Sequence, residues 1–128
     1  MDERNRAMRL AWIMTLKPGA EAEYKRRHDA IWPELREAIL ASGVTSFSIY
    51  RHGLMLFAYQ ERGPALTPPG EPAPVFWRWW REMAPLMETH PDGRPVQTPV
   101  EEVFNLTVGQ SGSASSNGRS RGNADEAQ

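Results

Sequence analysis

The sequence predicts an α+β fold in which helices cover one face of a four-stranded antiparallel sheet. Stretches of strand and helix character follow one another in the order strand, helix, strand, strand, helix, strand. A short turn at residues 51–53 joins the second and third strands, which makes them a hairpin. Helices connect the remaining strands, so both return on one side of the sheet. This order and these connections are those of a ferredoxin-like βαββαβ domain.

The first strand is expected at residues 8–16, and it is apolar on both faces. Ala11 and Ile13 form one face. The other face carries larger side chains: Met8, Leu10, Trp12, Met14 and Leu16. Because the helices cover only one face of the sheet, the second apolar face predicts a further covering layer. A second copy of the chain, packed sheet to sheet, would supply it and give a dimeric α+β barrel. Alternatively, the open face forms a ligand cleft.

The first helix is expected over residues 21–42, with an unusual stripe of side chains. Tyr24, His28 and Trp32 follow one another at intervals of four, so they lie along one face. Pro33 disfavours helical geometry at Trp32 and predicts a bend or a restart there. A phenol, an imidazole and an indole on one face can hold a polar ligand and move a proton.

The remaining helices, strands and loops are predicted from the spacing of apolar residues and from the positions of glycine and proline. Strands are expected at residues 44–50, 54–61 and 100–106, and a proline-rich loop at residues 62–74. A second helix is expected at residues 75–87, with a kink at Pro85. Its predicted buried stripe consists of Phe76, Trp80, Met83 and Met87. We expect one domain at residues 1–107, followed by a disordered polar tail at residues 108–128.

Composition excludes several classes of function. The chain has 15 basic and 16 acidic residues, which gives no electrostatic footprint for nucleic acid or an anionic membrane. It has no cysteine, and its three histidines are far apart, so the sequence predicts neither thiol chemistry nor a metal site. The N-terminal residues are charged, unlike a signal peptide, and no apolar run reaches the roughly 20 residues of a membrane helix. These features favour a cytoplasmic protein.

His28 is the first candidate for chemistry, because a neutral imidazole exchanges protons near pH 7. A solvent-facing helix histidine is the plainer alternative, and Tyr24 and Trp32 on the same face favour a pocket wall instead. Trp77, Trp79 and Trp80 cannot all face one way on a helix. Trp80 lies on the predicted buried stripe, and Trp79 borders it. Either a stacked sugar or aromatic ligand, or a bulky core with a dimer contact, would account for three indoles here.

Several short runs together resemble the L-rhamnose mutarotase family. The most specific runs from Tyr24 through His28 to the Trp32–Pro33 pair, and the second is the Trp79–Trp80 pair. Further similar segments are Ser-Ile-Tyr at 48–50, Leu-Phe-Ala at 56–58, His-Pro-Asp at 90–92 and Glu-Val-Phe at 102–104. The resemblance extends in order over about residues 8–106.

The resemblance implies a homodimeric ferredoxin-like barrel that interconverts the α and β anomers of L-rhamnopyranose without a cofactor or metal. It implies that His28 is the proton donor, that Tyr24 contacts the sugar, and that Trp79 and Trp80 line the sugar site. One position departs from the pattern, because Phe47 stands where the family usually has a sugar-contacting tyrosine. The loss of that hydroxyl bears on which sugar is bound.

Two other functions compete with this one. A cofactor-independent monooxygenase of the dimeric α/β barrel type would use the tryptophan-rich cleft for an aromatic substrate. A non-catalytic binding or dimerisation module would leave His28 without a chemical role. Oxygen uptake would distinguish the first from an isomerase, and ligand binding without anomer exchange would identify the second.

Overall fold

The computed structural model describes residues 8–65 and 70–108. The predicted leader at residues 1–7, the middle of the proline-rich loop and the tail beyond residue 108 lie outside the described residues. The elements, in order, are β1 (Met8–Thr15), α1 (Glu21–Asp29), α2 (Pro33–Ala41), β2 (Val44–His52), β3 (Met55–Arg62), α3 (Pro74–Met83), the 3-10 turn η2 (Ala84–Leu86) and β4 (Thr98–Pro99). The described helices are too short and too polar to cross a membrane.

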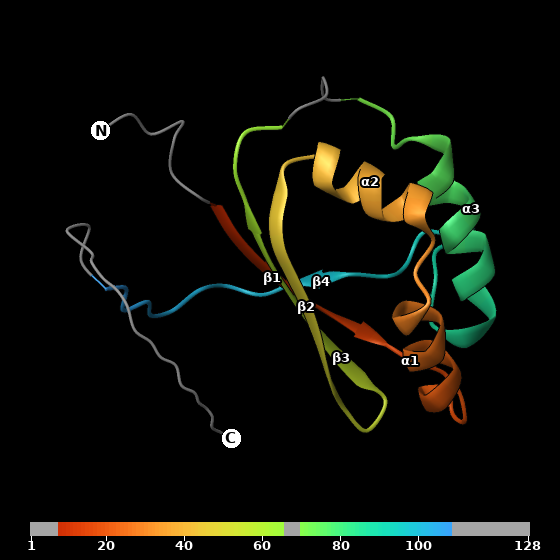
Figure 1. The fold of residues 1–128 in the computed structure, drawn as a ribbon. Helices are drawn as coiled ribbons and strands as arrows, with labels where there is room; N and C mark the ends of the chain where they lie inside the picture. Colours follow the sequence, from red (N-terminus) through yellow and green to blue (C-terminus); the bar gives the residue numbers. More distant parts are fainter. Residues whose placement is uncertain (1–7, 66–69, 109–128) are drawn as a thin grey trace.

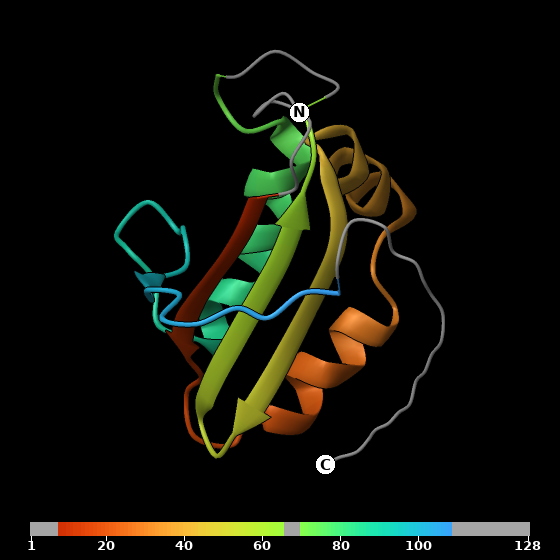
Figure 2. The same cartoon turned by 90° about the vertical axis from the view of Figure 1, so that its left-hand side faces the viewer.

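The four strands form one antiparallel sheet in the order β2-β3-β1-β4. The α-helices α1, α2 and α3 cover the same face of this sheet, and no helix of the described residues lies on its opposite face (Figures 1 and 2). The ferredoxin-like arrangement predicted from the sequence is therefore confirmed. β1 and β3 pair over their full lengths, from Met8 opposite Arg62 to Thr15 opposite Met55.

The first helical region restarts at Pro33, as its proline predicts. Residues 30–32 separate α1 from α2, and Trp32 takes an extended conformation with φ −64° and ψ 133°. Pro33 is the first residue of α2, where its missing N–H costs no hydrogen bond. The break lets α1 and α2 run in different directions across the sheet (Figure 1).

The core lies between the sheet and the helices. Met14 of β1, Leu16 just after that strand and Leu56 of β3 point into it, and all three are at most 5% exposed. The helices contribute Tyr24, Leu35, Val75, Trp79 and Met83. Full burial of one such apolar side chain stabilises the fold by about 1.5–3 kcal/mol, so this layer holds α1, α2 and α3 on the sheet.

The second predicted helix differs from expectation in its length and in its buried face. It ends as an α-helix at Met83, and Pro85 lies in the 3-10 turn that follows. Val75, Trp79 and Met83 are its buried residues, whereas Trp80 is half-buried. The predicted buried stripe was therefore right at Met83 and Met87, which are both 2% exposed, and wrong at Phe76 and Trp80, which are only partly buried. The stripe Val75–Trp79–Met83 has equally good helical spacing, and Trp79 is the indole that meets α1.

The predicted last strand at residues 100–106 is wrong. β4 contains only Thr98 and Pro99, which pair with Ile13 and Trp12 of β1. Proline has no N–H for the ladder, and only the Val100 amide continues the pairing, with the Ala11 carbonyl. Beyond it the chain leaves the sheet on the side away from the helices (Figures 1 and 2). Four apolar side chains of this segment are 77–85% exposed: Val103, Phe104, Leu106 and Val108.

Candidate functional site

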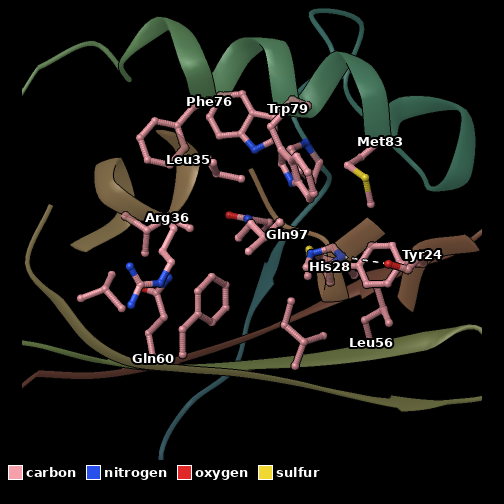
Figure 3. A pocket seen from close by; sticks show the side chains of 18 of the residues that line it. Tyr24, His28, Leu35, Arg36, Leu56, Gln60, Phe76, Trp79, Met83 and Gln97 are labelled. Carbon is pink, nitrogen blue, oxygen red and sulfur yellow. Dashed lines mark hydrogen bonds between the residues drawn. The ribbon is translucent and has the colours of Figure 1, made fainter. Parts of the chain in front are cut away.

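A cleft of about 1010 Å³ lies between the helices and the sheet, and α1, α2, α3 and the first three strands all contribute to it (Figure 3). Every site residue predicted from the sequence lines this cleft: Tyr24, His28, Phe47, Trp79 and Trp80. The fold thus brings together side chains that are up to 56 positions apart in the sequence (80 − 24 = 56). Trp32, the third residue of the helical stripe, is not among the lining residues and packs on the core instead.

His28 lies in the last turn of α1, and one of its ring nitrogens is hydrogen-bonded to the backbone of that helix. The His28 Nδ1 is 3.0 Å from the carbonyl oxygen of Tyr24, four residues earlier (Figure 3). A carbonyl only accepts, so Nδ1 carries the hydrogen and donates it. In the neutral ring Nε2 then holds the lone pair. This nitrogen is the one available for proton exchange.

Burial determines the charge of this imidazole. The pKa of His28 is lowered, chiefly because burial disfavours the charged ring, although the hydrogen bond to Tyr24 and the charge of Asp29 act in the opposite direction. His28 is therefore mainly neutral near pH 7. A neutral imidazole with a free Nε2 can accept a proton from a hydroxyl group and return it afterwards.

Tyr24 supports His28 and adds a hydroxyl to the cleft. The two rings lie against each other in a tilted arrangement, with their centroids 4.3 Å apart and an angle of 35° between their planes. Tyr24 is 7% exposed, and burial raises the pKa of its phenol well above the ordinary value. The phenol consequently stays protonated, so it can donate a hydrogen bond and does not act as a base.

Indole rings enclose the other side of His28. Trp79 contacts the imidazole edge to face, with centroids 5.3 Å apart, and contacts Trp32 in the same way at 5.1 Å. Trp80 packs against Phe76 and Trp77. The guanidinium of Arg94 lies 5.3 Å from the Trp77 ring centroid, so a cation covers the indole that faces away from the cleft.

In the described part of the chain, no group of three or more His, Cys, Asp or Glu side chains comes close enough to hold a metal ion. Aromatic and aliphatic side chains make up the larger part of the described cleft lining, and polar and charged side chains such as Arg36, Gln60 and Arg62 lie among them. This combination is typical of a site for a small organic molecule.

The L-rhamnose mutarotase family model matches residues 9–106, which is most of the chain. The chain belongs to the L-rhamnose mutarotase family. An L-rhamnose mutarotase of Leptothrix cholodnii is 44% identical over 101 residues, covering 77% of this chain and 95% of the relative. One of Bacteroides thetaiotaomicron is 43% identical over 101 residues, covering 77% of this chain and 97% of the relative.

A solved structure agrees with this assignment to the L-rhamnose mutarotase family. The crystal structure of L-rhamnose mutarotase from Formosa agariphila superposes with a TM-score of 0.70 at 37% sequence identity. The match covers 78% of this chain and 99% of that one.

Sequence reasoning missed several side chains that line the cleft of this family member. Trp12 lies beside Phe47, with ring centroids 5.9 Å apart, and its Nε1 is buried without a hydrogen-bond partner among the described residues. Gln60 rises from β3, and Gln97 enters between the sheet and α3 (Figure 3). Gln60 was not identified because it lies near the end of a predicted strand whose other residues are mostly apolar. Gln97 lies in a stretch with no regular period, so neither gave a signal.

Proposed function

We propose that this protein is an L-rhamnose mutarotase, a carbohydrate isomerase that interconverts the α and β anomers of L-rhamnopyranose. The observation that carries the proposal is the imidazole of His28, which is neutral, has Nδ1 bound to a carbonyl, and stands between Tyr24 and Trp79 in the cleft. Family membership supplies the sugar, and this geometry supplies a group that can move its protons.

Mutarotation needs two proton transfers. Removal of the proton from the anomeric hydroxyl forms the C1=O1 double bond, the C1–O5 bond breaks, and O5 takes up a proton. The carbonyl then rotates about C1–C2, and O5 attacks its other face. In our proposal Nε2 of His28 takes the O1 proton during opening and returns it during closure. The histidine is thus a base before it becomes the proton donor expected from the family. General acid–base catalysis of this kind contributes on the order of 10²- to 10⁴-fold.

The aromatic wall would hold the sugar in place. The faces of Trp79 and Trp80 would meet the C–H side of the ring and the 6-deoxy methyl group, which a more polar wall would disfavour. Tyr24, which stays protonated, would donate a hydrogen bond to a sugar oxygen, and a water molecule would give O5 its proton during opening and take it back during closure. All of these steps are proton transfers, so their balance calls for no oxidant or reductant.

We further propose that the protein is a cytoplasmic homodimer that packs through the uncovered face of the sheet. Tyr50, Phe57 and Ile13 stand side by side on this face, because they are register partners on β2, β3 and β1. Tyr50 is 63% and Phe57 38% exposed. The segment of residues 100–108 starts on the same face, where Arg9 donates two hydrogen bonds to the Glu102 carboxylate. Its exposed apolar side chains would pack on the second copy.

Anomer exchange measured by NMR near neutral pH tests the enzymatic proposal. The wild type should accelerate exchange of L-rhamnose more than that of L-fucose, and His28→Ala should lose most of the acceleration. His90→Ala is the matched control, because His90 is exposed in a turn, and it should behave as wild type. Full activity of His28→Ala would refute the role of His28. No acceleration of any sugar, together with oxygen consumption on a quinol, would favour a monooxygenase instead.

A further inference from the structure

Gln60 is the one polar side chain that is buried in the described part of the protein, and it is only 9% exposed. It lies on β3 two and four residues after Ala58 and Leu56, so its side chain points with theirs toward the helices. A buried amide normally has partners for both its oxygen and its nitrogen. For Gln60 the structure supplies a partner to one of them.

Arg62 fixes which way the amide of Gln60 points. The Arg62 Nη1 donates to the Gln60 Oε1 at 3.1 Å, and its Nη2 donates to the carbonyl oxygen of Ser42. Because a guanidinium only donates, the amide oxygen faces Arg62 and the NH₂ group faces the other way. Among the described residues no acceptor takes a hydrogen bond from that NH₂ group. Gln60 lines the cleft, so its free donor is available there.

The neighbour of Gln60 on this wall is apolar. Gln60 and Phe47 are direct partners in the β2–β3 ladder, and such partners point to the same face with Cβ atoms about 5 Å apart. Phe47 lines the same cleft without offering a hydrogen bond. The amide of Gln60 therefore offers a neutral hydrogen-bond donor beside Phe47, and Arg36 lines the same end of the cleft.

Gln60 lies at the end of the cleft opposite His28. Figure 3 shows Leu56 below Tyr24 and His28 at one end and Gln60 at the other. Four residues of strand separate Leu56 from Gln60, which is about 13 Å along β3. In a pyranose ring C4 lies directly across from C1. A sugar that has C1 beside His28 and its ring along the cleft would direct its C4 hydroxyl toward the end that holds Gln60.

We propose that Gln60 is a specificity-determining residue, whose amide donates a hydrogen bond to the C4 hydroxyl of the bound sugar. The assignment rests on the proposed mutarotase function, because that function places C1 at His28. It identifies the preferred substrates as 6-deoxy sugars with a free hydroxyl at C4. Arg62 acts through Gln60 as a positioning residue, since it holds the amide oxygen away from the sugar.

The test pairs a side-chain change with a matching change in the sugar. Gln60→Met keeps the length of the side chain and removes the donor. For L-rhamnose, kcat/KM of exchange should fall about 3- to 10-fold, the effect of one neutral hydrogen bond, mainly through a higher KM. For 4-deoxy-L-rhamnose, wild type and Gln60→Met should have the same kcat/KM. Thermal unfolding of both proteins verifies that the variant is folded.

A second variant keeps the assignment testable if Gln60→Met unfolds. Gln60→Glu preserves an acceptor for Arg62, and its carboxylate can accept from the same hydroxyl, so it should still prefer L-rhamnose over the 4-deoxy sugar. An equal loss for both sugars in Gln60→Met, or no preference in Gln60→Glu, would overturn the role of Gln60 while leaving the activity in place. Failure of the wild type to accelerate L-rhamnose exchange would instead overturn the proposed function, and this assignment with it.

Discussion

The imidazole of His28 lies against the ring of Tyr24 and donates a hydrogen bond from Nδ1 to the Tyr24 carbonyl. Tyr24 therefore orients the imidazole through both its side chain and its backbone. The centroid distance of 4.3 Å and the Nδ1–oxygen distance of 3.0 Å both follow from the four-residue spacing on α1. Trp79 of α3 closes the remaining side of the ring. The helix itself thus determines where Nε2 points.

The lowered pKa of His28 predicts the acid side of the pH profile. Exchange of L-rhamnose should stay fast as the pH falls through about 6.5, the ordinary histidine value, and should decline only below it as the ring becomes protonated. A profile that declines with a midpoint above 6.5 would contradict a buried neutral base.

The same shift predicts a pH dependence of stability. The unfolded chain binds a proton at His28 more readily than the folded protein, so the free energy of unfolding should rise with pH across this range. Stability is fully present above the unfolded pKa and is lost as the pH falls through the folded pKa. Urea unfolding at about pH 7 and about pH 5 should show this loss in the wild type and a smaller loss in His28→Leu.

The variant Tyr24→Phe should distinguish the contribution of the Tyr24 hydroxyl from that of its ring. The ring keeps its contact with His28 and its place in the core, so the free energy of unfolding should change by less than about 1.5 kcal/mol. The variant should lose about 3- to 10-fold in kcat/KM, because it lacks the hydroxyl that would donate a hydrogen bond to the sugar. Unchanged exchange rates would show that the Tyr24 hydroxyl does not contact the sugar.

Gly43 should tolerate no side chain. Its φ is +103°, and an added Cβ would lie 2.9 Å from the Gly63 carbonyl oxygen and 3.1 Å from the backbone at residues 64 and 65. Gly43→Ala should destabilise the fold by about 2–4 kcal/mol, combining a left-handed backbone with a clash. Gly53→Ala, at φ +61° in open space, is the matched control and should cost only about 1–2 kcal/mol. Equal losses of unfolding free energy would refute the close approach at Gly43.

A charged residue on the uncovered face of the sheet should disrupt the proposed dimer. Phe57→Asp places a charge in the middle of the uncovered sheet face, beside Ile13 and Tyr50. Light scattering at micromolar concentration should give a dimer for the wild type and a monomer for this variant. Glu37→Ala, on exposed α2, should remain dimeric. A monomeric wild type would eliminate the sheet-to-sheet arrangement.

Much of the fold could be predicted from the sequence, because the local helix, strand and turn patterns agree with the tertiary structure. Pro33 alone locates the break between α1 and α2. The buried face of α3 was not predictable in this way, because the stripes through Trp79 and through Trp80 have the same period. What selects Trp79 is its contact with His28 and Trp32 on other elements, which no local pattern records.

Other features depend equally on long-range contacts. Residues 100–106 have the composition of a strand, but only the Val100 amide pairs with β1, at the Ala11 carbonyl, before the chain leaves the sheet. In the sequence Gln60 lies at the end of an apolar strand. Its proposed role depends on its cross-strand pairing with Phe47 and on the hydrogen bond that Arg62 donates to it. The sequence shows which chemical groups are present, whereas register and packing decide which of them meet in the cleft.

The carbonyl that occupies Nδ1 of His28 also limits how the sugar can be handled. With that nitrogen committed, a single atom must serve both anomers, one of which presents its C1 oxygen above the ring plane and the other below it. The open-chain aldehyde must accordingly turn while the rest of the molecule stays gripped. In the proposed mechanism, contacts with the far substituents of the ring would hold the sugar while C1 turns.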